Sequence, residues 1–392
     1  MRILLCASTA PLPPTTGLRL VLVALLEQLR GRHEVRVVAF RDPDQVGEPE
    51  PDTRLVALPR PSLLDEALAV AGGAVRGRPR HADRLAAALR PALLSELEAF
   101  APDVVHVTAG RIAALGQALA GQPCIVAPLD AGELGIRARA DAASGLKRAL
   151  LRREERLVAR FEAEEFARYG RVVVVSDQDA DALRSLNPAL RVTVIPNGVD
   201  CERFAPGAGG PDRDESRLVF TGVMSSPPNV VAAELLAREI LPLVRARRPE
   251  ANLALVGRDP SPRVQALAAE EAVIVTGEVP DVGPWLAGSR VFACPMTTGT
   301  GIKNKLLEAM ATGLPCVATP LALGGLQVTP GVDLLAAETP AELADAIVRV
   351  LDDDALARRL GERARAYVTA NHGWRAVADE YVRVYTEVVA GR

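Results

Sequence analysis

Along the first half of the chain, short apolar runs alternate with longer segments whose apolar side chains recur at helical spacing. The predicted strands are Arg2–Ser8, His33–Phe40, Arg54–Leu58, Val104–Val107, Cys124–Pro128, Val172–Ser176 and Val192–Ile195. The predicted helical segments are Gly17–Arg30, Ser62–Phe100, which Gly72, Gly73 and Pro79 interrupt, and Ser144–Arg168. Strands that alternate with helices predict a parallel, doubly wound sheet.

The same alternation starts again after a segment rich in glycine, proline and aspartate, residues 206–214, which is predicted to be a linker. The strands predicted beyond it are Leu218–Thr221, Leu253–Val256, Ala272–Val275, Val291–Cys294 and Cys316–Ala318, and the helices are Val230–Ala246 and Lys303–Thr312. Two such sheets in series predict two domains that face each other across a cleft. Ligands of these sheets bind at the carboxyl ends of the strands, so the loops after the strands are expected to line the cleft.

The composition narrows the range of partners. The net charge of −3 over 392 residues gives no basic excess, which argues against a nucleic-acid partner. No stretch reaches the roughly 20 apolar residues of a membrane span. The apolar run in Met1–Ser8 is too short for a signal peptide. A cytoplasmic location is therefore expected, with peripheral contact at the inner membrane face left open.

The cysteines and histidines do not suggest a metal centre. The five cysteines are scattered and contain no CxxC pair, which argues against a disulfide framework and a zinc site. No cluster of aspartates or histidines with metal-ligand spacing is visible either. Metal-independent chemistry without a cofactor is therefore expected.

The segment from Pro295 to Pro315 carries the most specific chemical signal. A strand ends at Pro295, a loop containing Gly299 and Gly301 follows, and a helix is predicted to begin near Ile302. The free N–H groups and the dipole at a helix N-terminus favour an anion, and glycines allow its close approach to the backbone. This loop is therefore predicted to bind a phosphate group.

Charged side chains accompany that loop. Lys303 and Lys305 add positive charge beside the predicted anion site. Glu308 follows on the helix face that carries Lys305, and a carboxylate there suits the two hydroxyls of a ribose. The alternative is a solvated lysine pair followed by an ordinary helix glutamate.

At this point the sequence resembles a known family. The run Glu-Ala-Met-Ala-Thr-Gly-Leu-Pro-Cys-Val-Ala-Thr, residues 308–319, resembles the signature of glycosyltransferase family four, the retaining "group 1" transferases. Ile195–Asp200, Leu253–Gly257 and Val275–Asp281 resemble further elements of that family in the same order. The resemblance implies the GT-B fold, with two Rossmann-like, doubly wound α/β domains facing across a cleft.

The resemblance also implies a division of labour between the domains. Residues 1–198 would form the acceptor domain, with a C-terminal helix at 374–392 packing back on it, and residues 199–373 would form the nucleotide-sugar donor domain. Thr221–Met224 and Pro228–Asn229 resemble the branch associated with bacterial exopolysaccharide and exosortase systems. The implied donor-binding residues are Gly17, Gly222, Thr298, Gly299, Thr300, Gly301, Ile302, Lys303, Lys305 and Glu308.

Two departures from the family leave the donor sugar open. Most members have two glutamates in the donor loop, and Thr300 stands where the first of them is expected. An Arg and Lys pair that usually follows the first strand of the donor domain is absent, and Met224–Pro227 occupies its place. Arg258 and Lys303 are therefore the candidates to neutralise the diphosphate, with a surface role as the alternative for Arg258.

The N-terminal half offers fewer candidates. Of the paired glycines that family members have in the first loop, only Gly17 remains. His106 keeps the first position of a family His-x-His pattern and is a candidate catalytic residue, with a structural role as the alternative. Asp130, after the strand that ends at Pro128, is a catalytic candidate or a cap of the next helix.

The segment Ser144–Arg168 is dense in arginine and glutamate. Such charge is typical of a solvated helix face. Attraction to an anionic lipid or to a phosphorylated acceptor is the functional alternative.

The resemblance implies retaining transfer of a sugar from a UDP- or GDP-linked donor to an acceptor sugar, a glycolipid or a small molecule. In this mechanism the departing phosphate accepts the acceptor's proton, and helix N-termini and lysines stabilise the developing charge. Two alternatives stay open: a nucleotide-sugar epimerase on the same fold, and a binding protein without catalysis.

Overall fold

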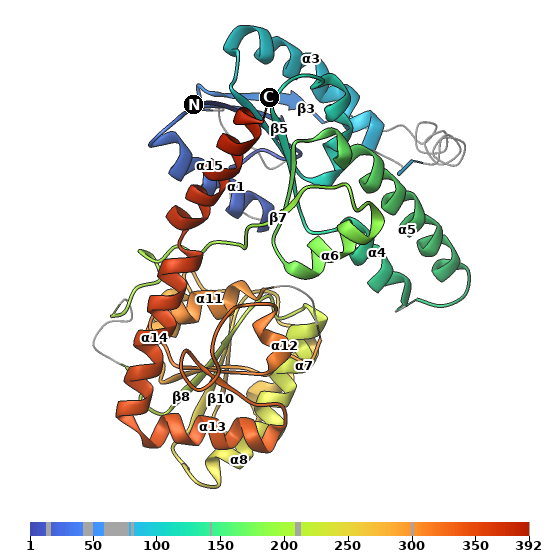
Figure 1. Ribbon diagram of the computed structural model, residues 1–392. Helices are drawn as coiled ribbons and strands as arrows, with labels where there is room; N and C mark the ends of the chain where they lie inside the picture. Colours follow the sequence, from blue (N-terminus) through green and yellow to red (C-terminus); the bar gives the residue numbers. More distant parts are fainter. Residues whose placement is uncertain are drawn as a thin grey trace. The chain divides into compact units, whose positions relative to one another are not determined.

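The computed structural model describes residues 1–12, 17–41, 50–58, 78–79, 82–141, 143–207, 213–298 and 302–391. The chain divides into two compact units, one formed by Met1–Pro196 with Val377–Arg392 and the other by Asn197–Ala376 (Figure 1). They are called unit 1 and unit 2, and each is described by itself.

Unit 1 is built on a seven-stranded parallel sheet of order β3-β2-β1-β4-β5-β6-β7. The strands are β1 (Arg2–Ala7), β2 (Glu34–Arg41), β3 (Thr53–Ala57), β4 (Val104–Thr108), β5 (Cys124–Leu129), β6 (Arg171–Val174) and β7 (Val192–Val194). The central strands β1, β4 and β5 are almost entirely buried, which explains their mainly apolar sequences. Strand order reverses between β1 and β4, so the switch point of this sheet lies there.

Helices and 3-10 turns cover the unit 1 sheet. They are α1 (Gly17–Arg30), α3 (Ala82–Phe100), the 3-10 helix η1 (Gly110–Ala118), α4 (Gly132–Asp141), α5 (Gly145–Glu165), η2 (Phe166–Arg168), α6 (Asp177–Leu186) and α15 (Trp374–Ala390), which joins unit 1 from Val377. Helices α4 and α5 pack side by side at the border of the unit (Figure 1).

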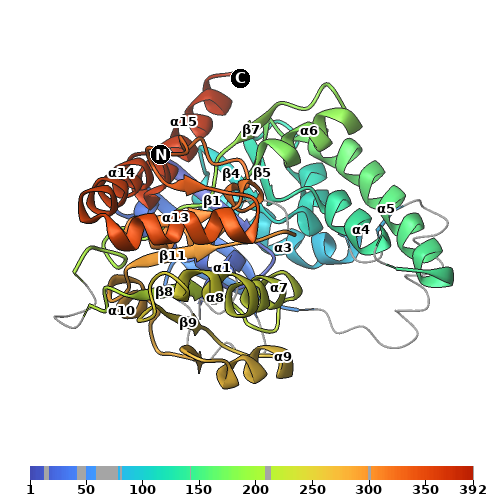
Figure 2. The same cartoon turned by 90° about the horizontal axis from the view of Figure 1, so that it is seen from below.

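Unit 2 has a six-stranded parallel sheet of order β10-β9-β8-β11-β12-β13, with its switch point between β8 and β11. The strands are β8 (Arg217–Thr221), β9 (Asn252–Val256), β10 (Val273–Gly277), β11 (Val291–Cys294), β12 (Cys316–Ala318) and β13 (Leu335–Ala336). The helical elements are α7 (Pro227–Leu235), η3 (Leu236–Ile240), α8 (Leu241–Arg245), α9 (Pro262–Gln265), η4 (Ala266–Ala269), α10 (Gly283–Ala287), α11 (Asn304–Ala311), α12 (Pro320–Leu323), α13 (Pro340–Asp352) and α14 (Asp354–His372). Figure 2 shows α7, α8 and α13 side by side over the sheet.

The predicted pair of parallel sheets is confirmed, and the differences are local. The helix expected over Val230–Ala246 contains a π-helical turn, η3. Pro242 follows this turn and has no N–H to donate to the preceding turn, so the regular pattern of hydrogen bonds is broken there. The two-residue strand β13 was not predicted, because it is too short to show a periodicity.

Candidate functional site

Three neighbouring strands of unit 2 are followed or ended by glycines with positive φ. The angles are 154° at Gly222, 149° at Gly257 and 69° at Gly277. The backbones are so close that a Cβ on Gly257 would lie 1.8 Å from the Gly222 carbonyl oxygen. Only main chain fits between these two positions, so the sheet presents a bare backbone edge beside its switch point. This is the glycine edge of unit 2.

The loop after β11 stands on the other side of the switch point. It leads from Cys294 to α11, and Lys303 is the N-cap residue of that helix. Thr298 is exposed, and Ile302 packs partly against the core of unit 2. The predicted donor residues Gly299, Thr300 and Gly301 lie outside the described residues.

Lys305 is the best-defined charged group at this edge. Its Nζ donates a 2.6 Å hydrogen bond to Asn229 Oδ1 and lies 4.2 Å from the centroid of the Phe220 ring. Asn229 is itself fixed, because its Nδ2 donates to the Val223 carbonyl at 2.9 Å. Burial lowers the pKa of Lys305 to about 8, while the nearby Glu308 acts in the opposite direction.

The Lys305 amine lies at the carboxyl end of β8. A Cβ on Gly222 would come within 2.7 Å of Nζ and 2.8 Å of Asn229 Nδ2. The loop after β8 lacks the Arg and Lys pair of the resembled family. The structure instead places a cation from α11 beside this loop. Asn229 was not among the predicted site residues, although it belongs to the quoted Pro228–Asn229 motif.

Lys303 and Glu308 complete the charged cluster. Lys303 is buried, and burial lowers the pKa of its amine. Burial raises the pKa of Glu308, whereas Arg203 and Lys305 favour its ionised form. In the described part of the chain the Glu308 carboxylate forms no ion pair or hydrogen bond. It is therefore available to accept hydrogen bonds from a ligand.

Arg258 follows Gly257 on the loop after β9. Its side chain is 55% exposed, and its guanidinium lies 3.5 Å from the carboxylate of Asp259. The Arg258 carbonyl accepts a 2.9 Å hydrogen bond from the Met224 amide, which ties this loop to the one after β8. Arg258 is thus at the glycine edge but faces solvent, and its role stays a prediction.

The protonation of Lys305 leads to a pH prediction. With a pKa of about 8 the amine is charged at pH 7 and loses its proton as the pH rises through 8 and 9. If the charge serves an anionic donor, kcat/KM should fall over that range, since this ratio reports groups of the free enzyme. Lys305→Arg should remove this alkaline decline. A kcat/KM profile that is flat from pH 7 to 9.5 in the unsubstituted protein would contradict the assignment.

Unit 1 has a pocket of about 520 Å³ at the carboxyl ends of its strands. Ser8 follows β1 and Ala109 follows β4, so the pocket opens at the switch point of this sheet. Two of its lining residues have left-handed backbones, Ala109 with φ 76° and Leu129 with φ 72°. Such conformations cost about 1–3 kcal/mol and are typical of functional sites.

Asp130 lines this pocket directly after β5. The helix α4 that follows is capped by other carboxylates: Glu162 Oε1 accepts from the Gly132 amide at 2.8 Å, and Asp179 Oδ1 accepts from the Ala131 amide at 2.9 Å. Burial and the charge of Asp179 raise the pKa of Asp130. Other carboxylates thus cap α4, and the role of Asp130 as a site residue stays a prediction.

Glu162 is a further carboxylate that the sequence did not single out. It comes from α5, is buried beneath the pocket, and burial raises its pKa to about 7. In the sequence it is one of many glutamates in a charged helix, and nothing in the spacing distinguishes it from its exposed neighbours.

His106 lies in the middle of β4 and not at its end, and its contacts fit the structural alternative. It is 1% exposed, its ring stacks on Tyr381 at 5.3 Å between centroids, and its Nδ1 shares a 2.7 Å hydrogen bond with the Tyr385 hydroxyl. Both tyrosines belong to α15. Burial lowers the pKa of His106 to about 3, so the ring is a neutral core group that joins β4 to α15.

This placement predicts how stability depends on pH. The pKa of His106 is about 3 in the folded chain and near 6.5 when unfolded, so the unfolded state binds more protons between these values. The stabilisation is complete above pH 6.5 and is lost as the pH falls, by up to about 1.4 kcal/mol per pH unit. Urea unfolding from pH 7 to 4.5 should show a steeper loss for the unsubstituted protein than for His106→Phe. Equal slopes for the two proteins would argue against this role.

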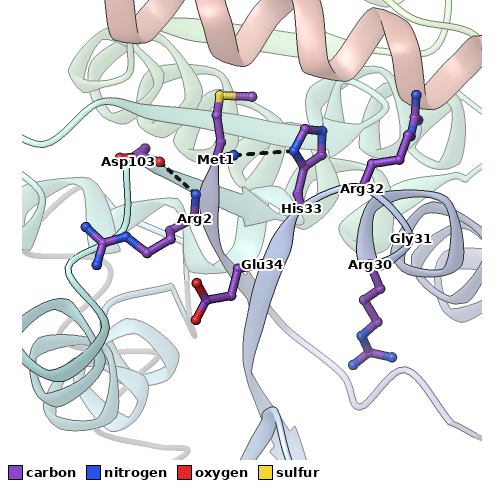
Figure 3. Close-up of a pocket in the computed structure, with 8 residues that line it drawn as sticks. All are labelled: Met1, Arg2, Arg30, Gly31, Arg32, His33, Glu34 and Asp103. Atoms are coloured by element: carbon purple, nitrogen blue, oxygen red, sulfur yellow. Dashed lines mark hydrogen bonds between the residues drawn. The ribbon is translucent and has the colours of Figure 1, made fainter.

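Other pockets lie at the opposite ends of the strands. One of about 540 Å³ surrounds the start of β1 and β2, where the Met1 amino group lies 3.4 Å from His33 Nδ1 and the Arg2 amide donates to Asp103 at 2.7 Å (Figure 3). Another, of about 840 Å³, lies at the amino ends of the unit 2 strands near Ser216 and Arg290. Because ligands of doubly wound sheets bind at the carboxyl ends, neither is assigned as the site.

Three further observations concern earlier expectations. Gly17 is the first residue of α1, after residues that lie outside the described ranges. Among the described residues, no three His, Cys, Asp or Glu side chains gather closely enough to hold a metal ion. No helix in those ranges has the length and apolar character needed to cross a membrane.

Comparison with known families gives two adjacent matches. Residues 15–203 match the family described as "Glycosyltransferase Family 4", and residues 215–353 match the one described as "Glycosyl transferases group 1". The two segments lie in unit 1 and unit 2, apart from Asn197 to Arg203 at the start of unit 2.

Curated relatives match over part of their length. The chain is 33% identical over 213 residues to the phosphatidyl-myo-inositol mannosyltransferase of Mycobacterium tuberculosis. This match covers 50% of this chain and 54% of that protein. It is 31% identical over 251 residues to the alpha-maltose-1-phosphate synthase of the same species, covering 56% and 63%. The matched part thus spans about half of the first of these relatives.

Solved structures match over the whole chain. A sucrose-phosphate synthase from Thermosynechococcus elongatus is similar at a TM-score of 0.70 and 20% identity, with 100% of both chains covered. HepE from Anabaena in complex with UDP is similar at a TM-score of 0.66 and 15% identity, covering 99% of this chain and 100% of that one. At these identities the likeness shows the fold alone.

Proposed function

Since the chain belongs to the family four, group 1 glycosyltransferases, we propose that it transfers a hexose from a nucleotide-diphosphate donor to an acceptor hydroxyl with retention of anomeric configuration. Unit 2 is proposed to hold the donor and unit 1 the acceptor. The observation that carries the proposal is the cluster of Lys305, Glu308 and the glycine edge at the switch point of unit 2.

The chemistry of the donor site follows from its charges. The diphosphate would lie along the glycine edge and the start of α11, where backbone N–H groups, Lys303 and Lys305 balance its charge. The ribose would hydrogen-bond to Glu308. Cleavage of the bond to the anomeric carbon moves negative charge to the leaving diphosphate, and fixed cations in a buried setting stabilise it without proton transfer.

The acceptor is proposed to enter the pocket of unit 1. Asp130 would accept a hydrogen bond from the acceptor hydroxyl and orient it, while the leaving phosphate takes its proton. Arg111 and Arg139 line the same pocket, as do the apolar side chains of Ile136, Val158 and Phe161. An acceptor with both an anionic and an apolar part suits this lining, which supports a glycolipid over a free sugar.

The nucleotide is UDP or GDP, catalysis does not need a metal ion, and the protein works in the cytoplasm with peripheral contact at the inner membrane face. The relatives named above act on phosphatidyl-myo-inositol or form maltose 1-phosphate by name, not on exopolysaccharide. Membership of the exopolysaccharide branch therefore rests on the resemblance of short motifs, among them Thr221–Met224 and Pro228–Asn229.

A donor screen tests the proposal. Thermal unfolding is followed with UDP- and GDP-linked hexoses, because a donor at about 100 times its Kd adds roughly 2.7 kcal/mol of apparent stability. The donor that stabilises the protein is then incubated with a membrane lipid extract, with and without EDTA. Transfer to lipid that survives EDTA is the expected result. Conversion of donor alone would support an epimerase, and donor binding without any turnover a binding protein.

A further inference from the structure

The first half of α5 carries an unusual outer face. Leu146 is 76% exposed and Leu150 is 57% exposed, and no other large apolar side chain in the described ranges is as exposed as these two. Their four-residue spacing puts them on one side of the helix, one turn apart. Leaving two neighbouring leucines in water is unfavourable, because burial of their apolar surface would stabilise the protein. A face of this kind indicates a partner.

Cations surround the two leucines. Arg153 continues the same side of α5 one turn beyond Leu150, and Lys147 and Arg156 flank that side. Glu154 also follows Leu150 by one turn, and it is half-buried at the pocket of unit 1. All three cations are at the surface, and within the part of the chain that the structure describes they enter no ion pair. They are therefore free to meet anions outside the protein. Leu146, Leu150, Lys147, Arg153 and Arg156 together are called the α5 face.

The opposite side of α5 fixes the helix to unit 1. Arg148 donates to the Ala140 and Asp141 carbonyls at the end of α4, at 3.3 and 3.1 Å. Further along, Glu162 holds the N-terminus of α4. The α5 face is thus presented by a helix that is anchored on its other side, as Figure 1 shows for the packing of α4 and α5.

We propose that the α5 face is the surface by which this protein docks on an anionic lipid bilayer. Leu146 and Leu150 would enter the interface between head groups and acyl chains, and the three cations would lie at the level of the anionic head groups. Apolar anchors beside lysines and arginines are the pattern of helices that lie on membranes. A protein partner would need an acidic surface with a matching apolar hollow, and nothing in the molecule indicates one.

Docking by this face would bring the acceptor pocket to the lipid. The same helix lines the pocket of unit 1 with Glu154, Val158 and Phe161, which follow Leu150 by about one, two and three turns. A lipid whose head group is to be glycosylated would then have a short path from the bilayer into the pocket. The purpose of docking rests on the proposed function, but the docking itself does not.

The experiment is sedimentation of the full chain with sucrose-loaded vesicles of phosphatidylcholine alone or of phosphatidylcholine mixed with phosphatidylglycerol, whose anionic head groups attract polybasic surfaces. Three proteins are compared: the unsubstituted chain, Lys147→Glu/Arg153→Glu/Arg156→Glu, and Leu146→Ser/Leu150→Ser. The matched controls are Arg349→Glu/Arg358→Glu/Arg359→Glu, with the same change of charge at exposed positions of unit 2, and Leu243→Ser.

The unsubstituted chain is expected to bind anionic vesicles and to dissociate in 0.5 M salt, roughly the concentration at which charges are screened within a few ångströms. Reversing three cations should lower the partition constant by at least about 100-fold, since each lost cation contributes about fivefold and the introduced glutamates are repelled by the anionic head groups. The leucine variant should bind weakly even in low salt, and both controls should bind normally. The proposal would be overturned if the controls lost as much vesicle binding as the α5 variants. It would also be overturned if the α5 variants bound vesicles as well as the unsubstituted chain. Donor stabilisation in solution is measured on the same variants and should be unchanged, so failure of docking and failure of the proposed function are separate results.

Discussion

Lys303→Ala is expected to lower kcat/KM on the order of 100- to 1000-fold, whereas Thr300→Ala should lower it by about tenfold or less. Lys303 caps the start of α11 and is buried at the donor side of unit 2. A cation in such a setting acts on the charge that develops on the leaving diphosphate, and one group of this kind typically contributes 100- to 1000-fold. Thr300 is neutral, and a net hydrogen bond contributes about 0.5–1.5 kcal/mol, which is at most about tenfold.

The comparison is made by steady-state kinetics, since kcat/KM reports lost stabilisation of the transition state. Lys303→Met is added because it keeps the apolar stem in the buried position and removes only the charge. Arg349→Ala, an exposed cation on α13, serves as the control and should keep full activity. A larger loss in Thr300→Ala than in Lys303→Met would mean that the sugar end of the loop does the chemistry that is assigned here to the phosphate end.

Glu308→Ala is expected to weaken donor binding by roughly 10- to 150-fold. The carboxylate is half-buried and has no protein partner among the described residues, so a ribose would supply its hydrogen bonds. Charge-assisted hydrogen bonds contribute about 1.5–3 kcal/mol each. Affinity should also fall as the pH is lowered towards the raised pKa of Glu308, because the protonated form is a weaker acceptor.

Calorimetric titration with UDP and GDP measures this effect directly. Glu308→Gln should lie between the alanine variant and the unsubstituted protein, because an amide keeps one acceptor oxygen without the charge. Glu239→Gln, an exposed glutamate on η3, is the matched control. An unchanged Kd in Glu308→Ala would contradict the proposed binding of the ribose by Glu308.

The architecture could be predicted from periodicity because both sheets are parallel and buried. Strands such as β1 and β4 are mainly apolar, and their spacing by helices leaves one main topology. The π-helical turn before Pro242 and the two-residue β13 could not be predicted, since neither has a period of its own. Such short features depend on tertiary contacts, which the local sequence pattern does not encode.

The site was predicted less completely, for reasons that differ from residue to residue. Glu308 and the lysines were found because the loop motif is contiguous in sequence. Asn229 was missed because its role depends on Lys305, which is 76 residues away and reaches it across the sheet. His106 looked like a strand-end residue of a cleft, and only the tertiary contact with Tyr385 shows that α15 covers it. Whether Asp130 caps α4 could be decided only from the groups that do cap this helix.

The glycine edge limits how donor preference can change in evolution or by design. A side chain at position 257 would collide with the Gly222 carbonyl, and one at position 222 would collide with Lys305 and Asn229. Larger side chains, which usually change the shape of a pocket, therefore do not fit along this edge. A ligand there would contact backbone atoms, which are the same for every amino acid. Variation must instead come from the loop between β11 and α11 and from the neighbours of Glu308. Libraries intended to change the proposed nucleotide-sugar specificity should be confined to those positions and leave the two glycines untouched.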